Sequence, residues 1–328
     1  MRRIALINQK GGVGKTTTTV NLGAALAEAG RRVLLIDLDP QANLTLHLDC
    51  APEPGSRSIY DVLTGNCTLD EATRPTRVEN LWVVPSDIDL SGAELELAAS
   101  FGRESLLKDA VEHRAGPSGD AKGASKYDYL LFDCPPSLGL LSVNGMVAAG
   151  EVILTLQTEF FALQGMSKLV DVIALLRRRL NPELTIAGIL PCLYDTRLRL
   201  AREVLGEIRK YFPGQVFERP IGKNVKLAEA PSYGQTILEY APDSSGAQDY
   251  RQLAAEVLAQ ELAPAADAPA TPRPAAVAEP VAEPVAEPVA EPVAEPAVEL
   301  TPAPRAPAPR PRAPRVRASI PPPSELPE

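Results

Sequence analysis

The stretch Lys10-Gly11-Gly12-Val13-Gly14-Lys15-Thr16-Thr17 decides the fold of this chain. The apolar run Ile4-Ala5-Leu6-Ile7 before it predicts a buried strand, and residues 18–29 after it have the apolar spacing of a helix. A strand, a glycine-rich loop and a helix in this order cradle phosphate, because the N–H groups of the loop point inward and the helix N-terminus adds partial positive charge. We therefore predict a phosphate-binding loop at residues 10–17.

Two side chains in this loop carry the expected chemistry. Lys15 is expected to reach the β- and γ-phosphates of a nucleotide, and the Thr16 hydroxyl to hold Mg²⁺. The match to the ordinary P-loop pattern is incomplete, because Gln9 stands where that pattern has glycine and a second lysine, Lys10, heads the loop. A glycine-rich turn that binds nothing is the alternative, and the register of strand, loop, lysines, threonines and helix argues against it.

Length and composition exclude several classes of protein. The first 262 of the 328 residues are enough for a large buried core. The net charge of −9 argues against a surface coated in basic groups, but not against a local basic patch. The four cysteines have no C-x-x-C spacing, so we expect free buried thiols in a reducing cytoplasm, and two histidines are too few for a histidine metal cluster. We expect no signal peptide and no membrane span, since no apolar run approaches ~18 residues.

Carboxylates follow two further apolar runs. Residues 33–36 lead into Asp37 and Asp39, and residues 129–132 lead into Asp133 and two prolines. Ligands bind at the carboxyl ends of parallel strands, so these acids are expected to face the phosphates of the opening loop. P-loop proteins hold Mg²⁺ with such an aspartate, and Asp133 is our candidate. The alternative for each acid is that it caps the next turn or helix.

The rest of the first 262 residues alternates between strands and helices. Strands are expected at 81–85, 151–157 and 185–193, and helices at 58–63, 91–115, 163–180 and 246–262. Within 91–115 the expected core residues are Leu95, Leu97, Leu106, Leu107 and Val111. Residues 116–125 are expected to form a loop. The alternation over six strands predicts an α/β fold, with a doubly wound, mostly parallel sheet flanked by helices.

Residues 263–328 differ sharply in composition from the first 262 residues. The sequence Val-Ala-Glu-Pro is repeated five times from Val277 to Pro296, and an arginine- and proline-rich stretch follows. Proline at every fourth residue forbids a helix and favours extended polyproline II. We therefore predict a folded domain with the phosphate-binding loop at 1–262 and a disordered tail at 263–328, which acts as a spacer or adds a basic contact.

The loop resembles a known family. Its two lysines, in the arrangement Lys10-Gly-Gly-Val-Gly-Lys15-Thr, resemble the deviant P-loop of the ParA/MinD superfamily of dimeric ATPases. The resemblance implies that ATP and Mg²⁺ are the cofactors and that Lys10 contacts the phosphates bound by the partner subunit of a homodimer. It also implies that Asp39 orients the attacking water and that Asp37 supports the Mg²⁺ shell. Lys10, Lys15 and Asp39 are then the catalytic residues.

Two C-terminal segments, 195–204 and 222–234, resemble the chromosome-partition (Soj) branch of ParA proteins. In that branch, residues matching Arg197 and Lys226 contact the DNA backbone, and a basic residue matching Lys223 lies nearby. Arg199 and Arg202 share a helix face beside them, which is either part of this patch or a solvated mixed-charge face. Relatives also hold the base with a Pro-x-Asn motif. Here Asn224 matches the asparagine, and Gly222 replaces the proline, which puts the rigidity of this contact in doubt.

The resemblance implies a switch. The ATP-bound dimer would bind double-stranded DNA without sequence preference and with strong salt dependence, and a ParB-like partner would stimulate hydrolysis to ADP and phosphate. Such a protein would be cytoplasmic and nucleoid-associated, and would segregate chromosome or plasmid origins. A ParA relative that positions chemoreceptors or microcompartments is the nearest alternative. A MinD-like division-site regulator is a further one, but would be expected to end in an apolar, basic helix.

Overall fold

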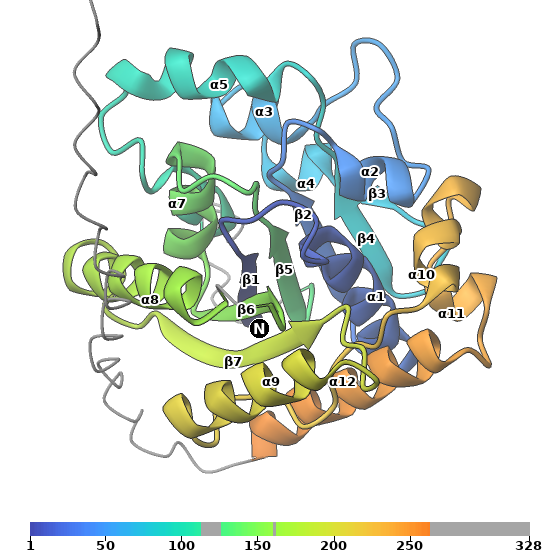
Figure 1. Ribbon diagram of the computed structural model, residues 1–328. Coiled ribbons are helices and arrows are strands. Elements are labelled where there is room, and N and C mark those ends of the chain that lie inside the picture. Colours follow the sequence, from blue (N-terminus) through green and yellow to red (C-terminus); the bar gives the residue numbers. More distant parts are fainter. Residues whose placement is uncertain (113–125, 160–161, 263–328) are drawn as a thin grey trace, which may run out of the picture. The chain divides into compact units, whose positions relative to one another are not determined.

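The strands form one sheet in the order β3-β4-β2-β5-β1-β6-β7, as the computed structural model shows (Figure 1). The structure describes residues 1–112, 126–159 and 162–262. Every neighbouring pair is parallel except β3 and β4, so the predicted mostly parallel sheet is confirmed. The strands are β1 (Arg2–Ile7), β2 (Val33–Asp37), β3 (Arg74–Pro75), β4 (Leu81–Val84), β5 (Tyr129–Asp133), β6 (Glu151–Gln157) and β7 (Thr185–Cys192).

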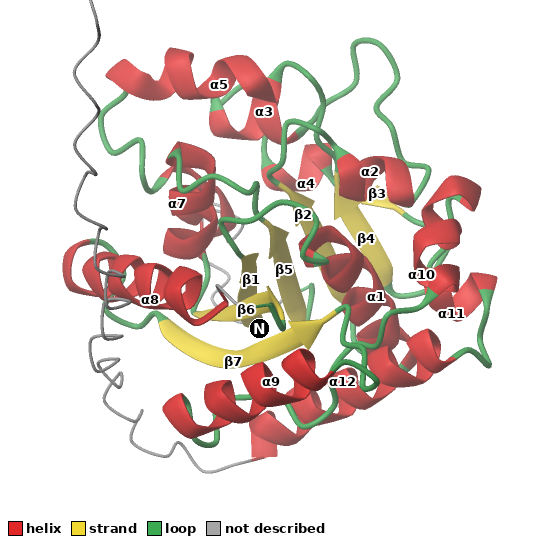
Figure 2. Ribbon diagram, viewed as in Figure 1, coloured by secondary structure: helices red, strands yellow, loops and turns green. Residues whose placement is uncertain are grey.

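Helices cover both faces of the sheet, because successive strand residues point to opposite sides (Figure 2). Ile4 and Leu6 of β1 pack into one buried cluster, and Ala5 and Ile7 pack into the other. The helices that contribute to the cluster of Ile4 are α1 (Lys15–Glu28), α2 (Asn43–His47), α10 (Val225–Glu229), α11 (Ile237–Tyr240) and α12 (Ser245–Leu262).

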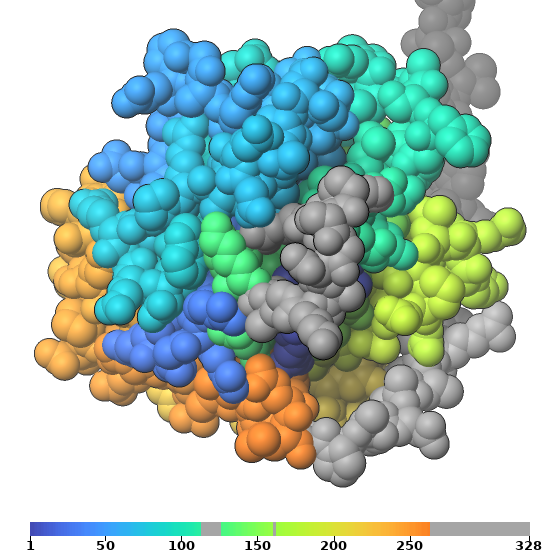
Figure 3. Space-filling model, turned by 180° about the vertical axis from the view of Figure 1, so that it is seen from behind, coloured from blue at the N-terminus to red at the C-terminus, as the bar shows by residue number. Residues whose placement is uncertain are grey.

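The cluster of Ala5 receives the remaining helices. They are α3 (Ile59–Leu63), α4 (Leu69–Ala72), α5 (Leu90–Glu96), the 3₁₀ helix η1 (Leu97–Ala99), α6 (Leu106–Glu112), α7 (Leu140–Ala148), α8 (Ala162–Arg179) and α9 (Arg199–Tyr211). A second 3₁₀ helix, η2 (Ala230–Tyr233), links α10 to α11. In the view from behind, the blue-to-cyan part of the chain that contains α3, α4 and β3 lies above the orange α12 (Figure 3).

The predicted elements at 58–63, 163–180, 185–193 and 246–262 are confirmed to within two residues at each end. The predicted helical region 91–115 is divided into α5, η1 and α6, and its last residues lie outside the described part, as do the loop 116–125 and the tail. Leu95 is 84% exposed, so its prediction as a core residue is wrong: it lies on the outer side of α5, whereas Leu90 and Ala93 point inward. The prediction of buried thiols holds for Cys134 and Cys192 but is wrong for Cys50 and Cys67, which are half-buried.

The order of the strands places the predicted site. β1 lies between β5 and β6, and β5 lies between β1 and β2. In the registers, Asp133 pairs with Leu6 on one side and with Asp37 on the other. The carboxyl ends of β1, β2 and β5 therefore meet where the phosphate loop begins. No helix within the described residues has the length and apolar character needed to cross a membrane.

Candidate functional site

The phosphate loop joins β1 to α1 as predicted. Gly12 and Gly14 have φ of +72° and +91°, a left-handed conformation that glycine adopts without strain. Gly14 is also the N-cap of α1, with no side chain over the first turn. The Lys15 side chain turns back into the loop, where its Nζ donates to the carbonyl oxygen of Lys10 at 3.3 Å. A free helix N-terminus beside a buried cation is suited to phosphate.

The loop opens into a cavity of about 460 Å³ with two chemically different ends. One end carries the phosphate loop and acids, from Gly11, Gly12, Gly14, Lys15, Thr16, Thr17, Asp39, Gln41 and Asn43. The other end is mostly apolar and is formed by Cys192, Leu193, Ile221, Asn224, Leu227, Ala228, Pro231 and Tyr250, with His47 and Pro136 also in the wall. A charged end for phosphates and an apolar end for a flat base are suited to a nucleotide.

Asp133 is fully buried behind the loop. Its Oδ1 accepts from Thr19 Oγ1 at 3.1 Å, whereas Oδ2 has no hydrogen-bond partner in the described part of the structure. Burial, followed by the charge of Asp37, raises the pKa of Asp133, and the Thr16 and Thr19 hydroxyls act against this. An unpartnered buried carboxylate oxygen beside the Thr16 hydroxyl fits a site for hydrated Mg²⁺.

Burial lowers the pKa of Lys15, while the charges of Asp133 and Asp39 favour its protonated form. Lys15 is only 6% exposed, so its ammonium has few waters to compensate its charge. The strong negative charge of a triphosphate would supply that compensation. The cavity is therefore suited to a negatively charged ligand.

Asp37 and Asp39 lie side by side but differ in their surroundings. Both oxygens of Asp37 are used by the protein: Oδ1 accepts from the Asp39 N–H at 3.1 Å, and Oδ2 accepts from Thr45 N–H at 3.0 Å and Thr45 Oγ1 at 2.7 Å. Burial raises the pKa of Asp37. Asp39 reaches the cavity wall, and its main-chain oxygen accepts from Ser86 Oγ at 2.9 Å. Asp37 is thus held by the protein beside the site, whereas Asp39 lines the cavity.

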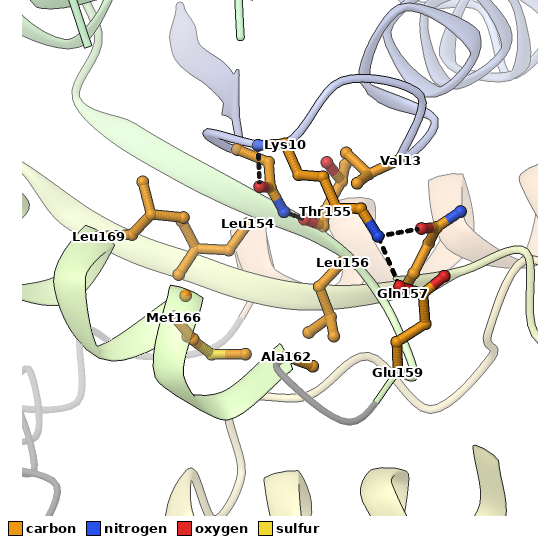
Figure 4. A pocket seen from close by; sticks show the side chains of 12 residues that line it. Lys10, Val13, Leu154, Thr155, Leu156, Gln157, Glu159, Ala162, Met166 and Leu169 are labelled. Carbon is orange, nitrogen blue, oxygen red and sulfur yellow. Dashed lines mark hydrogen bonds and ion pairs between the residues drawn. The ribbon is translucent and has the colours of Figure 1, made fainter. Parts of the chain in front are cut away.

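Lys10 points away from the phosphate loop of its own subunit. Its Nζ contacts Glu159 Oε2 at 2.5 Å and Gln157 Oε1 at 3.2 Å, at the end of β6 (Figure 4). The Lys10 side chain is 57% exposed, so these contacts are weakly held. The main chain is fixed more firmly, because Asn8 Oδ1 accepts from the Lys10 N–H at 2.8 Å. The second lysine is therefore available to a molecule outside this subunit.

Gly222 and Asn224, the residues expected to hold the base, lie on the loop between α9 and α10. Asn224 is in the cavity wall and caps α10 through the Lys226 N–H at 2.8 Å. Its Nδ2 donates to Ser245 Oγ at 2.9 Å. Gly222 lies two residues away, outside the residues that line the cavity. Asn224 therefore lines the cavity, whereas Gly222 does not.

The predicted basic residues are all exposed, and the loops that carry two of them lie together. The Arg197 loop and the Lys223 loop lie side by side, because the Lys223 N–H donates to the Tyr194 carbonyl at 3.0 Å. Several of these cations pair with neighbouring groups: Arg197 with Asp195 at 2.7 Å, Arg199 with Glu203 at 2.6 Å, and Lys226 with Glu229 at 2.9 Å. Arg202 donates to the carbonyl of Thr196. Exposed pairs of this kind contribute little free energy, so a phosphate can replace the carboxylate.

Among the residues of this site that had not been predicted, four hold its parts in place. Thr19 holds Asp133, Thr45 and Ser86 hold the Asp39 loop, and Tyr250 donates to or accepts from Thr18 Oγ1 at 3.2 Å from distant α12. Thr19 follows the tandem threonines of the loop, so its position was readable in the sequence. The other three come from segments whose meeting depends on the tertiary fold.

The chain matches proteins of known family. Residues 1–186 match the family described as AAA domain. The sporulation initiation inhibitor protein Soj of Bacillus subtilis is 44% identical over 256 residues, which are 78% of this chain and 98% of Soj. The chromosome partitioning protein ParA of Caulobacter vibrioides is 43% identical over 261 residues, 80% of this chain and 95% of ParA.

A solved structure agrees with this match. Cobyrinic acid a,c-diamide synthase of Mycobacterium smegmatis, with a bound ATP analogue and magnesium, has a TM-score of 0.68 and 37% identity, and the match covers 80% of this chain and 96% of that protein. The fold and the cavity define a P-loop nucleotide-binding protein of the AAA domain family. Within that class, the chain belongs to the Soj/ParA family of chromosome-partitioning ATPases.

Proposed function

We propose that this protein is an ATP-dependent switch that dimerises with bound ATP, binds DNA as the dimer and is released by ATP hydrolysis. The observation that carries the proposal is the pairing of a buried lysine in a phosphate loop with a second, exposed lysine directed out of the subunit. Lys15 binds the phosphates of the nucleotide held by the same subunit. Lys10 is free to exchange Glu159 for the phosphates of a second copy.

The residues of the cavity then have distinct tasks. Lys10, Gly11, Gly12, Val13, Gly14, Lys15, Thr16 and Thr17 hold the phosphates. Thr16 and Asp133 hold Mg²⁺, which supplies charge neutralisation at the β- and γ-oxygens, and Asp37 adds a neighbouring negative charge. Asp39 orients the attacking water, and its loop is fixed by Thr45 and Ser86. Asn224 lines the base end of the cavity, and Gly222, which does not line it, is part of the backbone that leads to Asn224.

DNA binding is assigned to the surface of Arg197, Arg199, Arg202, Lys223 and Lys226. These side chains offer charge to phosphates and carry no pattern that would read bases, so the binding is nonspecific. The names of the relatives Soj and ParA support a chromosome or plasmid origin as the cargo and a nucleoid-associated location. A ParB-like protein is the expected activator.

The proposal is tested by the ATPase rate of the protein alone, with double-stranded DNA, and with DNA and a candidate ParB-like protein. We expect slow turnover alone, because the catalytic groups of one subunit are incomplete, and a marked increase when both partners are present. Lys15→Ala is the control for contaminating ATPase. A rate that is fast in the absence of partners and unchanged by them would contradict the proposal.

A further inference from the structure

The loop at the base end of the cavity is fastened to α12 by a buried carboxylate. The Gly222 N–H donates to Asp249 Oδ2 at 2.9 Å, and Arg219 Nε donates to Asp249 Oδ1 at 2.7 Å. Asp249 is 3% exposed. Both of its oxygens are therefore engaged with the segment that leads into the cavity wall at Ile221 and Asn224.

This bond depends on a residue that differs from the Pro-x-Asn motif. A proline at position 222 would have no N–H, and Asp249 Oδ2 would lose its donor. Glycine keeps the donor but gives the free chain more conformations than proline does. In the motif, the proline ring restricts the backbone conformation before the asparagine. In this chain, the hydrogen bond from Gly222 to Asp249 restricts the backbone before Asn224 instead.

We propose that Asp249 is a positioning residue for the nucleobase: through Gly222 it fixes the loop of Ile221 and Asn224 against the apolar end of the cavity. The inference rests on the proposed function, because it assumes that ATP occupies this cavity. The next residue, Tyr250, lines the cavity and contacts Thr18 in α1. One turn of α12 thus supports the base end and the helix behind the phosphate loop together.

Two ligands separate base recognition from phosphate recognition: a nonhydrolysable ATP analogue with Mg²⁺, and inorganic tripolyphosphate with Mg²⁺. Calorimetry should show that Asp249→Ala weakens binding of the analogue about tenfold and changes binding of tripolyphosphate less than about twofold. Equal losses for both ligands, or no loss for either, would overturn the inference. A wild-type protein that binds neither ligand would overturn the proposed function, and this inference with it.

Matched variants distinguish positioning from a general loss of structure. Glu256 is another acid of α12. Its carboxylate accepts hydrogen bonds from the main-chain N–H groups of Glu218 and Arg219, one before and one within the same segment, but not from Gly222. Glu256→Gln should therefore leave both affinities unchanged. Asp249→Asn keeps an acceptor for Gly222 and should bind the analogue at least about fivefold more tightly than Asp249→Ala. An Asp249→Asn variant as weak as Asp249→Ala would contradict the role of this bond.

A compensating change tests the argument about rigidity. A Cβ at Gly222 would lie 3.4 Å from Asp249 Oδ2, which is ordinary contact, so a larger residue has space. Adding Gly222→Pro to Asp249→Ala should recover most of the affinity for the analogue, because the ring replaces the lost hydrogen bond. A double variant that binds no better than Asp249→Ala would overturn the inference. Thermal unfolding without nucleotide verifies that each variant is folded.

Discussion

In the proposed function, nucleotide binding depends most directly on Lys15. It is buried in the loop, and within the described residues its ammonium is compensated by the acids of the site and a main-chain oxygen. Replacing Lys15 with alanine removes charge-assisted contacts of about 1.5–3 kcal/mol, so we expect the affinity for ATP to fall on the order of 10- to 100-fold or more. Calorimetry with an ATP analogue measures this, and unchanged affinity would reject the assignment of the loop.

Asp39 should affect hydrolysis rather than binding. It faces the cavity from a loop fixed by Ser86, whereas the phosphates are held by other residues. We expect Asp39→Ala to bind ATP and dimerise but to hydrolyse ATP about 10²-fold more slowly or worse. Single-turnover hydrolysis and analogue binding, measured on the same sample, test this. Brisk hydrolysis by the variant would refute the water-orienting role.

Asp133 should make the nucleotide-free protein less stable as the pH rises. Burial and Asp37 raise its pKa in the folded state, so above its ordinary value of 3.8 the folded state holds more protons than the unfolded chain. The free energy of unfolding therefore falls as pH rises from about 4 towards neutrality. Relative to Asp133→Asn, the wild type should lose about 1–3 kcal/mol over this range. Denaturant unfolding of both proteins measures the difference, and a constant difference would contradict the prediction.

At the scale of elements, the proposed DNA surface is carried by the first turns of α9 and α10 and by the loops that precede them. Arg197→Glu combined with Lys226→Glu should weaken DNA binding of the ATP dimer and leave dimerisation intact. Two lost phosphate contacts should reduce the slope of log affinity against log salt by about 2. Fluorescence anisotropy with DNA at several salt concentrations measures the slope. Arg177→Glu, an exchange at the end of α8, is the control, and equal slopes for the double variant and the wild type would remove this surface from the proposal.

The elements also show what the sequence can and cannot specify. The six parallel strands, the phosphate loop, Asp39 and Asp133 were predictable, because glycine spacing and apolar runs that end in acids are local signals, whereas the two-residue antiparallel strand β3 was not predicted. Leu95 was misassigned because α5 is short and its inward face depends on its neighbours. Thr45, Ser86 and Asp249 were not predictable as site residues, since each acts through a contact that only the packing of the sheet, α2 and α12 creates.

At the scale of the whole molecule, the proposed switch requires two copies of the protein that complete each other's sites. In one copy, the Lys15 side chain lines the cavity beside the phosphate loop, whereas the Lys10 side chain contacts Glu159 and Gln157. An exposed ion pair holds it there only weakly, so the triphosphate of a second subunit is a stronger partner. ATP binding and dimerisation should then be separable: Lys15 is needed for the first, and Lys10 for the second.

The most direct test is the mass of the protein in solution, by light scattering, with a nonhydrolysable ATP analogue and Mg²⁺. We predict that the wild type and Lys168→Ala, an exposed lysine of α8, become dimers, whereas Lys10→Ala binds the analogue and remains a monomer. Dimerisation of Lys10→Ala with the same nucleotide dependence as the wild type would contradict the central claim that this lysine joins the two subunits.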